Sequence, residues 1–482
     1  MESTMKPPMK PMDELPVAVI GAGPIGLAAA ANLAERGIPF RVFEAGATVG
    51  ANLRDWGHVR IFTTWEQNLD PASRRLLEAD GWTVRSPDAL PTGEELYRDY
   101  LKPLAALPVL NGSIVTGAKV ARITRLGLDK VTSKGREGRP FELRIDADNG
   151  TFRTELARAV IDASGTWQNA NPLGGSGVEA EGEEEFRRNL AYGMPDVLGA
   201  QRARYAGKRI AVIGSGYSAI QTLLDLARLC QDAPRTQVTW VVRGKNMAKV
   251  YGGGENDQLP ARGKLGMRLK PLVEQGRVRL VQGFSTRAVA NGSDALTLSG
   301  MTATGSQTIE GFDEIIVATG QRPNLAMTRE LRLELDPWLE SVKALGPLID
   351  PNVHSCGSVQ PHGHRETSHP EPGFYTIGVK SYGRAPTFLL LTGYEQARSV
   401  AAAIAGDLQA ADSTQLCLPE TGVCTSQFDR TGGDASPGCC GGPAPDGVDA
   451  CCLADVEART TKGELCGCGA PVASSHRAVE PV

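Results

Sequence analysis

The sequence predicts an α/β fold with two Rossmann-like, three-layer domains, one inserted into the other, and a cysteine-rich C-terminal tail that is disordered on its own. Three observations support this fold class. An apolar run, a glycine-rich turn, an Ala- and Leu-rich helix and a second apolar run occur twice along the chain. The 482 residues suffice for two or three domains of roughly 150 residues each. Cysteine is almost confined to the last part, which is rich in Gly, Pro and Ala.

The first unit opens with the apolar run Val17–Ile20, which suits a buried parallel strand. The glycines that follow, in the spacing G-x-G-x-x-G, are Gly21, Gly23 and Gly26. In that order they permit a tight turn, let the backbone approach a pyrophosphate, and let the helix pack closely on the strand. The next apolar run ends at Glu44, whose carboxylate can accept hydrogen bonds from ribose hydroxyls and would repel a 2′-phosphate. The unit therefore predicts a site for FAD or NAD.

The second unit repeats this order far downstream, with a different charge at its end. Its turn, Gly-Ser-Gly-Tyr-Ser-Ala, contains four candidate cofactor-binding residues: Gly214, Gly216, Ser218 and Ala219. Alanine at the third position is an accepted variant of the motif. The strand after the helix ends in Arg243, with Lys245 beyond it. Because a cation suits a 2′-phosphate, this second site is expected to prefer NADPH over NADH.

Two further apolar strands end in Ala-Ser/Thr-Gly, at Gly165 and at Gly320, as expected where a chain leaves one dinucleotide-binding domain for the next. The first of them follows an expected hairpin with its turn at 148–150. We therefore predict a flexible N-terminus (1–15), an FAD-binding domain in two pieces (16–200 and 335–410), an NADPH-binding domain between them (201–334) and a flexible tail (411–482).

A third segment, Pro372–Ala401, is expected to complete the FAD-binding domain. A strand is predicted to end at Gly378, followed by a loop and a helix that runs toward Ala405. The positive N-terminal end of such a helix can stabilise the negative charge of a reduced flavin.

Composition excludes some function classes. The net charge is −4, which gives neither a nucleic acid nor an anionic membrane surface a global electrostatic attraction. No apolar run reaches the ~18 residues of a membrane span, and the first fifteen residues lack the apolar core of a secretory signal. We therefore expect a cytoplasmic enzyme with a small-molecule substrate and no nucleic-acid or membrane partner. The oligomeric state is left open.

The cysteines are unevenly placed. Of the ten cysteines, none precedes Cys230, and eight lie between Cys417 and Cys468. The six candidate metal ligands in the tail are Cys439, Cys440, Cys451, Cys452, Cys466 and Cys468. Closely spaced thiolates are soft ligands that suit Cu(I), Zn, Hg(II) or arsenic(III), although this spacing does not match a structural zinc site. Capture of arsenic(III) by the tail is one hypothesis, and unspecific metal or redox buffering is the alternative.

With both glycine motifs and both Ala-Ser/Thr-Gly strands, the chain from Val17 to Ala405 resembles the two-dinucleotide-domain flavoproteins, and among them the flavin-containing monooxygenases. Three short segments also resemble a flavoprotein group associated with arsenic-resistance operons: 251–263, 348–357 and 418–424. The broader resemblance implies hydride transfer from NADPH to FAD. Reduced FAD then forms a C4a-(hydro)peroxide with O₂ that oxygenates a soft nucleophile, or passes its electrons to another acceptor.

The chain departs from the related reductases at the pair of residues that begins with Gly378. The Gly-Asp pair that contacts the flavin ribityl chain in related reductases is here Gly378-Val379, with Lys380 next.

Asn68 corresponds to an asparagine that the monooxygenases hold near the flavin, and Tyr382 lies in the flavin-end loop, so both are candidate catalytic residues. Two alternatives stay open: a flavin reductase for a thiol-bound metalloid or a protein partner, and a protein that only sequesters a metalloid.

Overall fold

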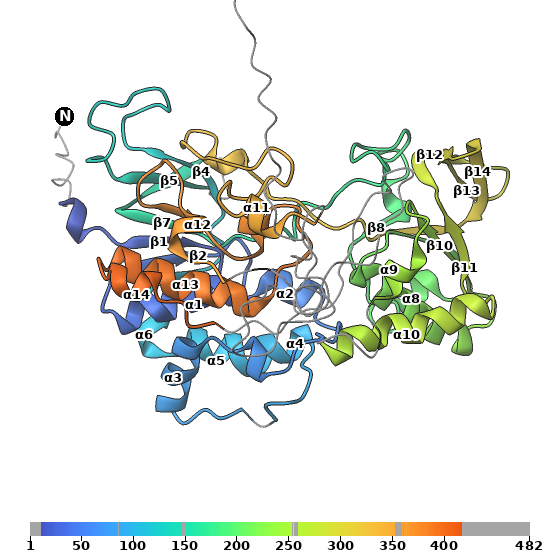
Figure 1. Ribbon diagram of the computed structural model, residues 1–482, viewed down its shortest axis with the longest axis horizontal. Coiled ribbons are helices and arrows are strands. Elements are labelled where there is room, and N and C mark those ends of the chain that lie inside the picture. Colours follow the sequence, from blue (N-terminus) through green and yellow to red (C-terminus); the bar gives the residue numbers. More distant parts are fainter. Residues whose placement is uncertain are drawn as a thin grey trace, which may run out of the picture. The chain divides into compact units, whose positions relative to one another are not determined.

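A computed structural model of the chain describes residues 11–84, 86–146, 151–252, 254, 259–351, 359 and 361–416. These residues all belong to the first of the two units into which the chain divides, Met1–Gln427. The structure confirms the predicted α/β class, with parallel sheets in two Rossmann-like domains (Figure 1). The domain limits proposed from the sequence stay a prediction.

The first parallel sheet has the strand order β16-β7-β1-β2-β3. Its strands are β1 (Val17–Ile20), β2 (Phe40–Phe43), β3 (Ile114–Val115), β7 (Ala159–Asp162) and β16 (Phe374–Thr376). Segments far apart in the sequence are neighbours here, since Ile20 of β1 is in register with Asp162 of β7, and Thr376 of β16 is in register with the same residue. Glu44 and Gly378, the predicted ends of two strands, lie just beyond β2 and β16.

This sheet is the middle of three layers. Alternate residues of β1 face opposite sides, because side chains alternate along a strand. Val17 and Val19 pack with helices α1 (Pro24–Glu35) and α13 (Leu390–Ile404), which lie side by side (Figure 1). Ala18 and Ile20 pack instead against an antiparallel sheet. Its strands are β4 (Val120–Arg125), β5 (Phe141–Asp146) and β6 (Phe152–Ala157). The predicted hairpin joins β5 and β6, and its turn lies outside the described residues.

The second parallel sheet has the order β11-β10-β9-β15-β8. Its strands are β8 (Leu190–Tyr192), β9 (Arg209–Ile213), β10 (Gln237–Val242), β11 (Arg279–Gln282) and β15 (Glu314–Val317). One face packs on α8 (Tyr217–Asp232) and α10 (Pro260–Glu274). The other face packs on an antiparallel sheet of β12 (Ser285–Asn291), β13 (Leu296–Thr302) and β14 (Gly305–Phe312). The same three-layer arrangement therefore occurs twice.

A helical excursion separates β2 from β3. Its elements are α2 (Ala51–Asp55), η2 (Glu66–Asn68), α3 (Pro71–Ala79), α4 (Gly93–Leu96), the π-helix η3 (Tyr97–Leu101), α5 (Lys102–Ala106) and α6 (Pro108–Asn111). The other short helices are η1 (Met12–Glu14), η4 (Arg187–Asn189), α7 (Arg202–Tyr205), α9 (Met247–Tyr251), η6 (Ala326–Thr328), α11 (Gly346–Ile349), α12 (His364–Thr367), η7 (Gly378–Tyr382) and α14 (Leu408–Asp412). The segment after β16, expected as a loop, thus begins with a turn of 3₁₀-helix.

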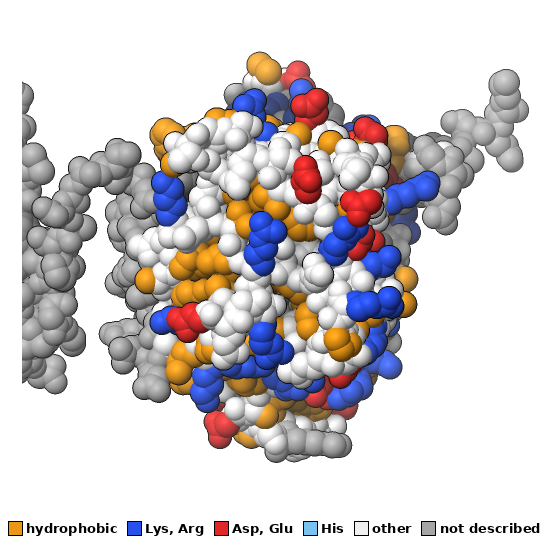
Figure 2. Space-filling model, turned by 90° about the vertical axis from the view of Figure 1, so that its right-hand side faces the viewer, with side chains coloured by type: hydrophobic (Ala, Val, Ile, Leu, Met, Phe, Trp, Pro, Cys, Tyr) orange, Lys and Arg blue, Asp and Glu red, His pale blue; other side chains and the backbone are white. Residues whose placement is uncertain are grey.

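The surface carries charges of both signs. In Figure 2, Lys and Arg side chains are spread over one face together with Asp and Glu, with small apolar areas between them. Among the described residues, no helix has both the length and the apolar character that crossing a membrane requires.

Candidate cofactor site

The first glycine turn connects β1 to α1 and leaves no room for side chains on its inner side. Gly21 has φ +94°, and a Cβ at this residue would lie 2.8 Å from the carbonyl oxygen of Ala163. A Cβ on Gly26 would lie 1.9 Å from the carbonyl oxygen of Gly21, so the third glycine is required for the helix to approach the turn. A Cβ on Gly23 would meet nothing within 4 Å. The turn is therefore closed toward the protein and open at Gly23, where a pyrophosphate would lie.

Glu44 is fixed beside this turn by two backbone groups. Its Oε2 accepts a hydrogen bond from the backbone N–H of Ala22 at 2.7 Å, and its Oε1 accepts one from the N–H of Gly46 at 2.7 Å. An ionised carboxylate has about four lone-pair positions, so two remain for ribose hydroxyls. The carboxylate and the open N-terminal end of α1 together fit the ribose and pyrophosphate of FAD.

The second glycine turn has the same construction. Gly214 has φ +130°, and a Cβ there would lie 2.2 Å from the carbonyl oxygen of Ala318, whereas one on Gly216 would meet nothing within 4 Å. The indole Nε1 of Trp240 donates to the Gly214 carbonyl at 2.7 Å and so ties the turn to β10. Ser218 is half-buried and Ala219 is buried in the first turn of α8. The turn fits the pyrophosphate of a second dinucleotide.

Arg243 directly follows β10, as predicted. Its Nη1 donates to the carbonyl oxygen of Gly175. Arg243 is exposed, but partial desolvation by its neighbours and, to a smaller degree, the positive charge of Arg384 lower its pKa from the ordinary value. Two guanidinium groups thus add their fields where the second strand of this domain ends, which favours an anionic group such as a 2′-phosphate.

Three more predicted residues lie at the carboxyl ends of strands. Gly165 follows β7, and a Cβ there would lie 3.8 Å from the Val379 side chain. Gly378 follows β16, and its backbone N–H donates to Gln396 Oε1 at 2.7 Å. Gly320 follows β15 in the other domain. Ligands of open α/β sheets bind at the carboxyl ends of the strands, so each glycine lies at the expected edge of its sheet.

Both candidate catalytic residues are buried. The Asn68 side chain is 1% exposed. Its Oδ1 accepts from Thr63 Oγ1 at 2.9 Å, and its Nδ2 donates to the carbonyl oxygens of Thr63 and Thr64 at 3.0 and 2.8 Å. Asn68 therefore holds the 63–68 turn together, and its proposed contact with the flavin stays a prediction.

Tyr382 is fully buried, and its ring packs against those of His362 and Phe388 at centroid distances of 5.5 and 5.3 Å. Burial raises the pKa of Tyr382 above its ordinary value. Within the described part of the chain its hydroxyl forms no hydrogen bond of regular geometry, although the nearby Thr392 side chain opposes part of the pKa shift. A neutral phenol in this position could donate a hydrogen bond to a ligand, but its catalytic role stays a prediction.

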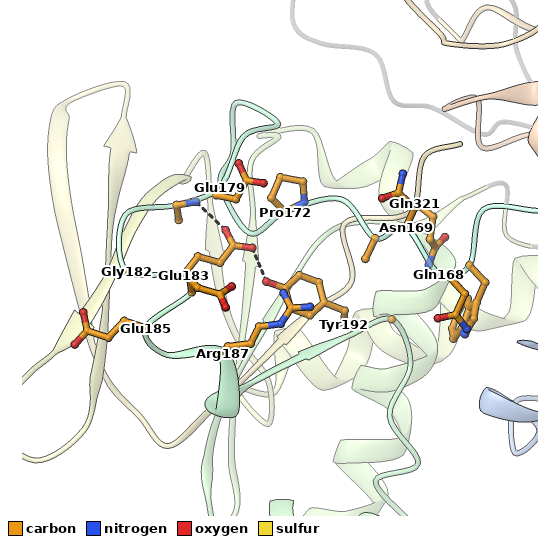
Figure 3. A pocket seen from close by; sticks show the side chains of 15 residues that line it. Gln168, Asn169, Pro172, Glu179, Gly182, Glu183, Glu185, Arg187, Tyr192 and Gln321 are labelled. Atoms are coloured by element: carbon orange, nitrogen blue, oxygen red, sulfur yellow. Dashed lines mark hydrogen bonds between the residues drawn. The ribbon is translucent and has the colours of Figure 1, made fainter. Parts of the chain in front are cut away.

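The sequence did not point to a pocket of about 690 Å³ along the segment that joins β7 to β8. Its lining is mostly polar and includes Trp167, Tyr192 and several glutamates. Figure 3 shows Glu183 directed toward the Tyr192 hydroxyl, which donates to Glu183 Oε1. Glu183 also accepts from the backbone N–H groups of Leu173 and Ala180 at 2.9 and 2.7 Å. This carboxylate is therefore occupied in holding the segment together.

A buried ion pair at the edge of the first sheet was also missed. Asp162 ends β7 and Lys380 lies in η7, two residues after Gly378. An acid at the end of an otherwise apolar strand, and a lysine inside an apolar stretch, are the signals that could have drawn attention to them.

The predicted thiolate site lies outside the described residues, as do parts of all three segments that carried the narrower resemblance. Within the ranges that the structure describes, no three His, Cys, Asp or Glu side chains form a group that could hold a metal ion. The described free cysteine is Cys230, and burial raises the pKa of its thiol.

The fold and the two glycine turns together define a flavoprotein oxidoreductase that binds FAD and NADP(H). The chain belongs to the pyridine nucleotide-disulphide oxidoreductase family, whose profile matches residues 18–342. A search of curated proteins finds no significant match.

Several solved structures share the fold. Bacillithiol disulfide reductase from Bacillus cereus has a TM-score of 0.61 at 17% identity, over 81% of this chain and 99% of that one. Ornithine N-hydroxylase from Kutzneria sp. has a TM-score of 0.54 at 17% identity, over 84% and 100%. A flavin-containing monooxygenase from Stenotrophomonas maltophilia has a TM-score of 0.50 at 22% identity, over 82% and 99%. Because reductases and monooxygenases both occur among them, the fold leaves the reaction open.

Proposed function

We propose that the protein is an NADPH-dependent FAD monooxygenase that oxygenates a soft nucleophile. One observation carries the choice of oxygenase over disulfide reductase: the chain has no cysteine before Cys230. A flavin-dependent disulfide reductase needs at least one reactive cysteine next to its flavin, most often as a pair. Cys230 lies in α8, packed against the core of the second domain, where its thiol contacts the carbonyl oxygen of Thr236 at 3.5 Å. It has no second cysteine nearby in the sequence.

NADPH is the proposed electron donor because of the charges at the two strand ends. The acid Glu44 follows β2 and the cation Arg243 follows β10. A carboxylate repels a 2′-phosphate and a guanidinium attracts it, so the two phosphate turns are expected to sort FAD from NADPH. Bound FAD supplies the redox chemistry, while the protein positions it and the substrate and excludes water.

Oxygen uptake tests the reaction class. The purified flavoprotein is supplied with NADPH and with one of three probes: arsenite, a thioether or a tertiary amine. An oxygenase consumes O₂ in step with NADPH and with oxygenated product, and the product stops forming when O₂ is removed. Product formation that continues without O₂ would instead establish a reductase. As a control, the enzyme without probe reports the NADPH that is lost to hydrogen peroxide.

Arsenic(III) is the second part of the proposal, and the cysteines between Cys417 and Cys468 favour it. Adjacent thiolates can hold a trivalent thiophilic centre and present it for oxidation. The variant in which Cys439, Cys440, Cys451 and Cys452 are replaced by Ser should lose tight arsenite binding while it retains FAD. Unchanged arsenite binding would remove the tail from the proposal. A protein that only sequesters the metalloid would bind arsenite equally well but show no NADPH turnover stimulated by it.

A further inference from the structure

A lysine ammonium group is buried at the carboxyl edge of the first sheet. The side chains of Lys380 and Asp162 are 2% and 1% exposed, and Lys380 Nζ lies 2.7 Å from Asp162 Oδ2. Lys380 Nζ also donates to Ser164 Oγ at 3.0 Å. Removing two charges from water is costly, and such a pair is often no more stabilising than apolar residues of the same size. Stability alone therefore gives little reason for this pair.

The pair lies directly behind the first glycine turn. Asp162 is in register with Ile20, the last residue of β1 before Gly21. The next residues of the same segment touch the turn, since a Cβ on Gly21 would lie 2.8 Å from Ala163 O and 3.1 Å from Ser164 Cα. The neighbour of Lys380, Val379, lies against Gly165 at the end of this segment. The ammonium group is thus placed at the edge where FAD must pass.

The hydrogen bonds around the ammonium group leave it one donor. Ser164 Oγ donates to Asp162 Oδ1 at 2.7 Å and accepts from Lys380, and the Ser164 N–H also donates to Asp162 Oδ1 at 3.2 Å. A lysine has three N–H donors. Asp162 and Ser164 are its acceptors within the described part of the chain. The third N–H is therefore available to a ligand.

We propose that Lys380 is an FAD-binding residue whose third N–H donates to an oxygen atom of the ribityl-pyrophosphate portion of FAD. Asp162 and Ser164 hold the ammonium group in place and compensate its charge while the site is empty. The pyrophosphate carries two negative charges, which complement the ammonium group at short range. This inference rests on FAD binding and not on the reaction class.

Titration of the apoprotein with FAD, followed by flavin fluorescence, tests this role without any turnover. Lys380→Met should raise the Kd for FAD by about tenfold to a hundredfold, the usual loss for one charge-assisted hydrogen bond. The control is Lys343→Met, because Lys343 forms a similar ion pair with Glu334 at 2.6 Å but is 60% exposed. Its Kd should equal that of the wild type.

A double variant separates ligand binding from simple charge compensation. Asp162→Asn/Lys380→Met contains no unpaired buried charge, so the apoprotein should unfold at the wild-type urea concentration even if Lys380→Met alone does not fold. If the double variant binds FAD as weakly as predicted for Lys380→Met, the proposal is supported. If it binds FAD like the wild type, Lys380 only neutralises Asp162 and the proposal is wrong. A wild-type Kd for Lys380→Met would refute it as well. Absence of O₂-dependent product would affect the proposed reaction alone.

Discussion

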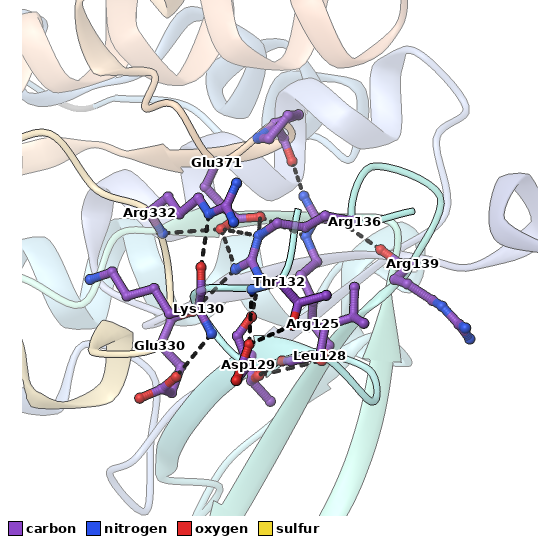
Figure 4. A network of polar contacts seen from close by, with 12 residues as sticks. Arg125, Leu128, Asp129, Lys130, Thr132, Arg136, Arg139, Glu330, Arg332 and Glu371 are labelled. Atoms are coloured by element: carbon purple, nitrogen blue, oxygen red, sulfur yellow. Dashed lines mark hydrogen bonds and ion pairs between the residues drawn. The ribbon is translucent and has the colours of Figure 1, made fainter. Parts of the chain in front are cut away.

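The substitution Glu371→Gln tests how the structure holds its distant segments together. Figure 4 shows two arginines directed at this glutamate, which precedes β16. Arg125 Nε and Arg136 Nη2 each lie 2.7 Å from a Glu371 oxygen, and the backbone N–H of Arg332 donates at 3.0 Å. All three ionised side chains are 3% exposed or less. Burial by itself raises the pKa of Glu371, but the bonds from Arg136 and Arg125 outweigh it and lower the pKa overall.

The expected loss of stability follows from this geometry. Glutamine has nearly the size of glutamate, so no cavity forms, but two guanidinium groups lose their counter-charge while buried. Breaking a buried pair on one side costs about 3–5 kcal/mol. With a urea m-value of about 3 kcal/mol/M, the midpoint of unfolding should fall by about 1 M or more.

Urea unfolding followed by circular dichroism and by flavin fluorescence measures this shift. The matched control is Glu78→Gln, which removes a pair that Glu78 Oε1 forms with Arg74 Nε at 2.7 Å. Glu78 is 45% exposed, and such surface pairs contribute about 0–1 kcal/mol. A Glu371→Gln midpoint as close to the wild type as that of Glu78→Gln would refute the role given to the buried network.

Three other outcomes are expected. Arg243→Gln should raise the KM for NADPH about tenfold to a hundredfold and leave that for NADH unchanged in steady-state assays, because it removes a charge-assisted bond to the 2′-phosphate; equal changes for both would contradict this. Gly26→Ala should destabilise the apoprotein in urea, whereas Gly23→Ala, whose Cβ meets nothing within 4 Å, should leave it stable but weaken FAD binding in a fluorescence titration. Burial raises the pKa of Asp70 to about 6, so the folded protein keeps a proton that the unfolded chain has lost, and stability declines as the pH rises from about 4 to 6. Asp70→Asn lacks this dependence. Between pH 4 and 6 its free energy of unfolding, measured with urea, should therefore rise relative to that of the wild type by up to about 3 kcal/mol. Parallel pH profiles of the two proteins would refute the pKa shift.

The sequence predicted both Rossmann-like units because their signals are local. Gly21, Gly23 and Gly26 stand within a few residues of each other, and the contact that requires Gly26, with the Gly21 carbonyl, occurs within one turn. The contact that requires Gly21 comes instead from Ala163, in a distant segment, and no spacing in the sequence shows it. Glu44 and Arg243 were found for the same reason, since each follows its glycine turn by one helix and one strand. The antiparallel sheet β12-β13-β14 has no such motif, and the helical excursion after β2 was likewise not predicted.

Contacts between distant segments were beyond prediction. Glu371 and Arg125 are in contact although 246 positions separate them in the sequence. Lys380 meets Asp162 because β16 is placed next to β7. No spacing in the sequence relates these residues. Asn68 shows a limit of resemblance. The resemblance suggested that its side chain lies near the flavin, whereas its side-chain amide forms hydrogen bonds within the 63–68 turn.

Anaerobic stopped-flow reduction of the bound flavin tests whether the glycine turn beside Glu44 binds FAD and the one beside Arg243 binds NADPH. The purified protein is mixed with NADPH or with NADH, and loss of the oxidised flavin absorbance is followed. We expect a yellow protein that NADPH bleaches much faster than NADH does at equal concentration. A colourless protein that binds no flavin, or equal rates with the two nucleotides, would contradict it.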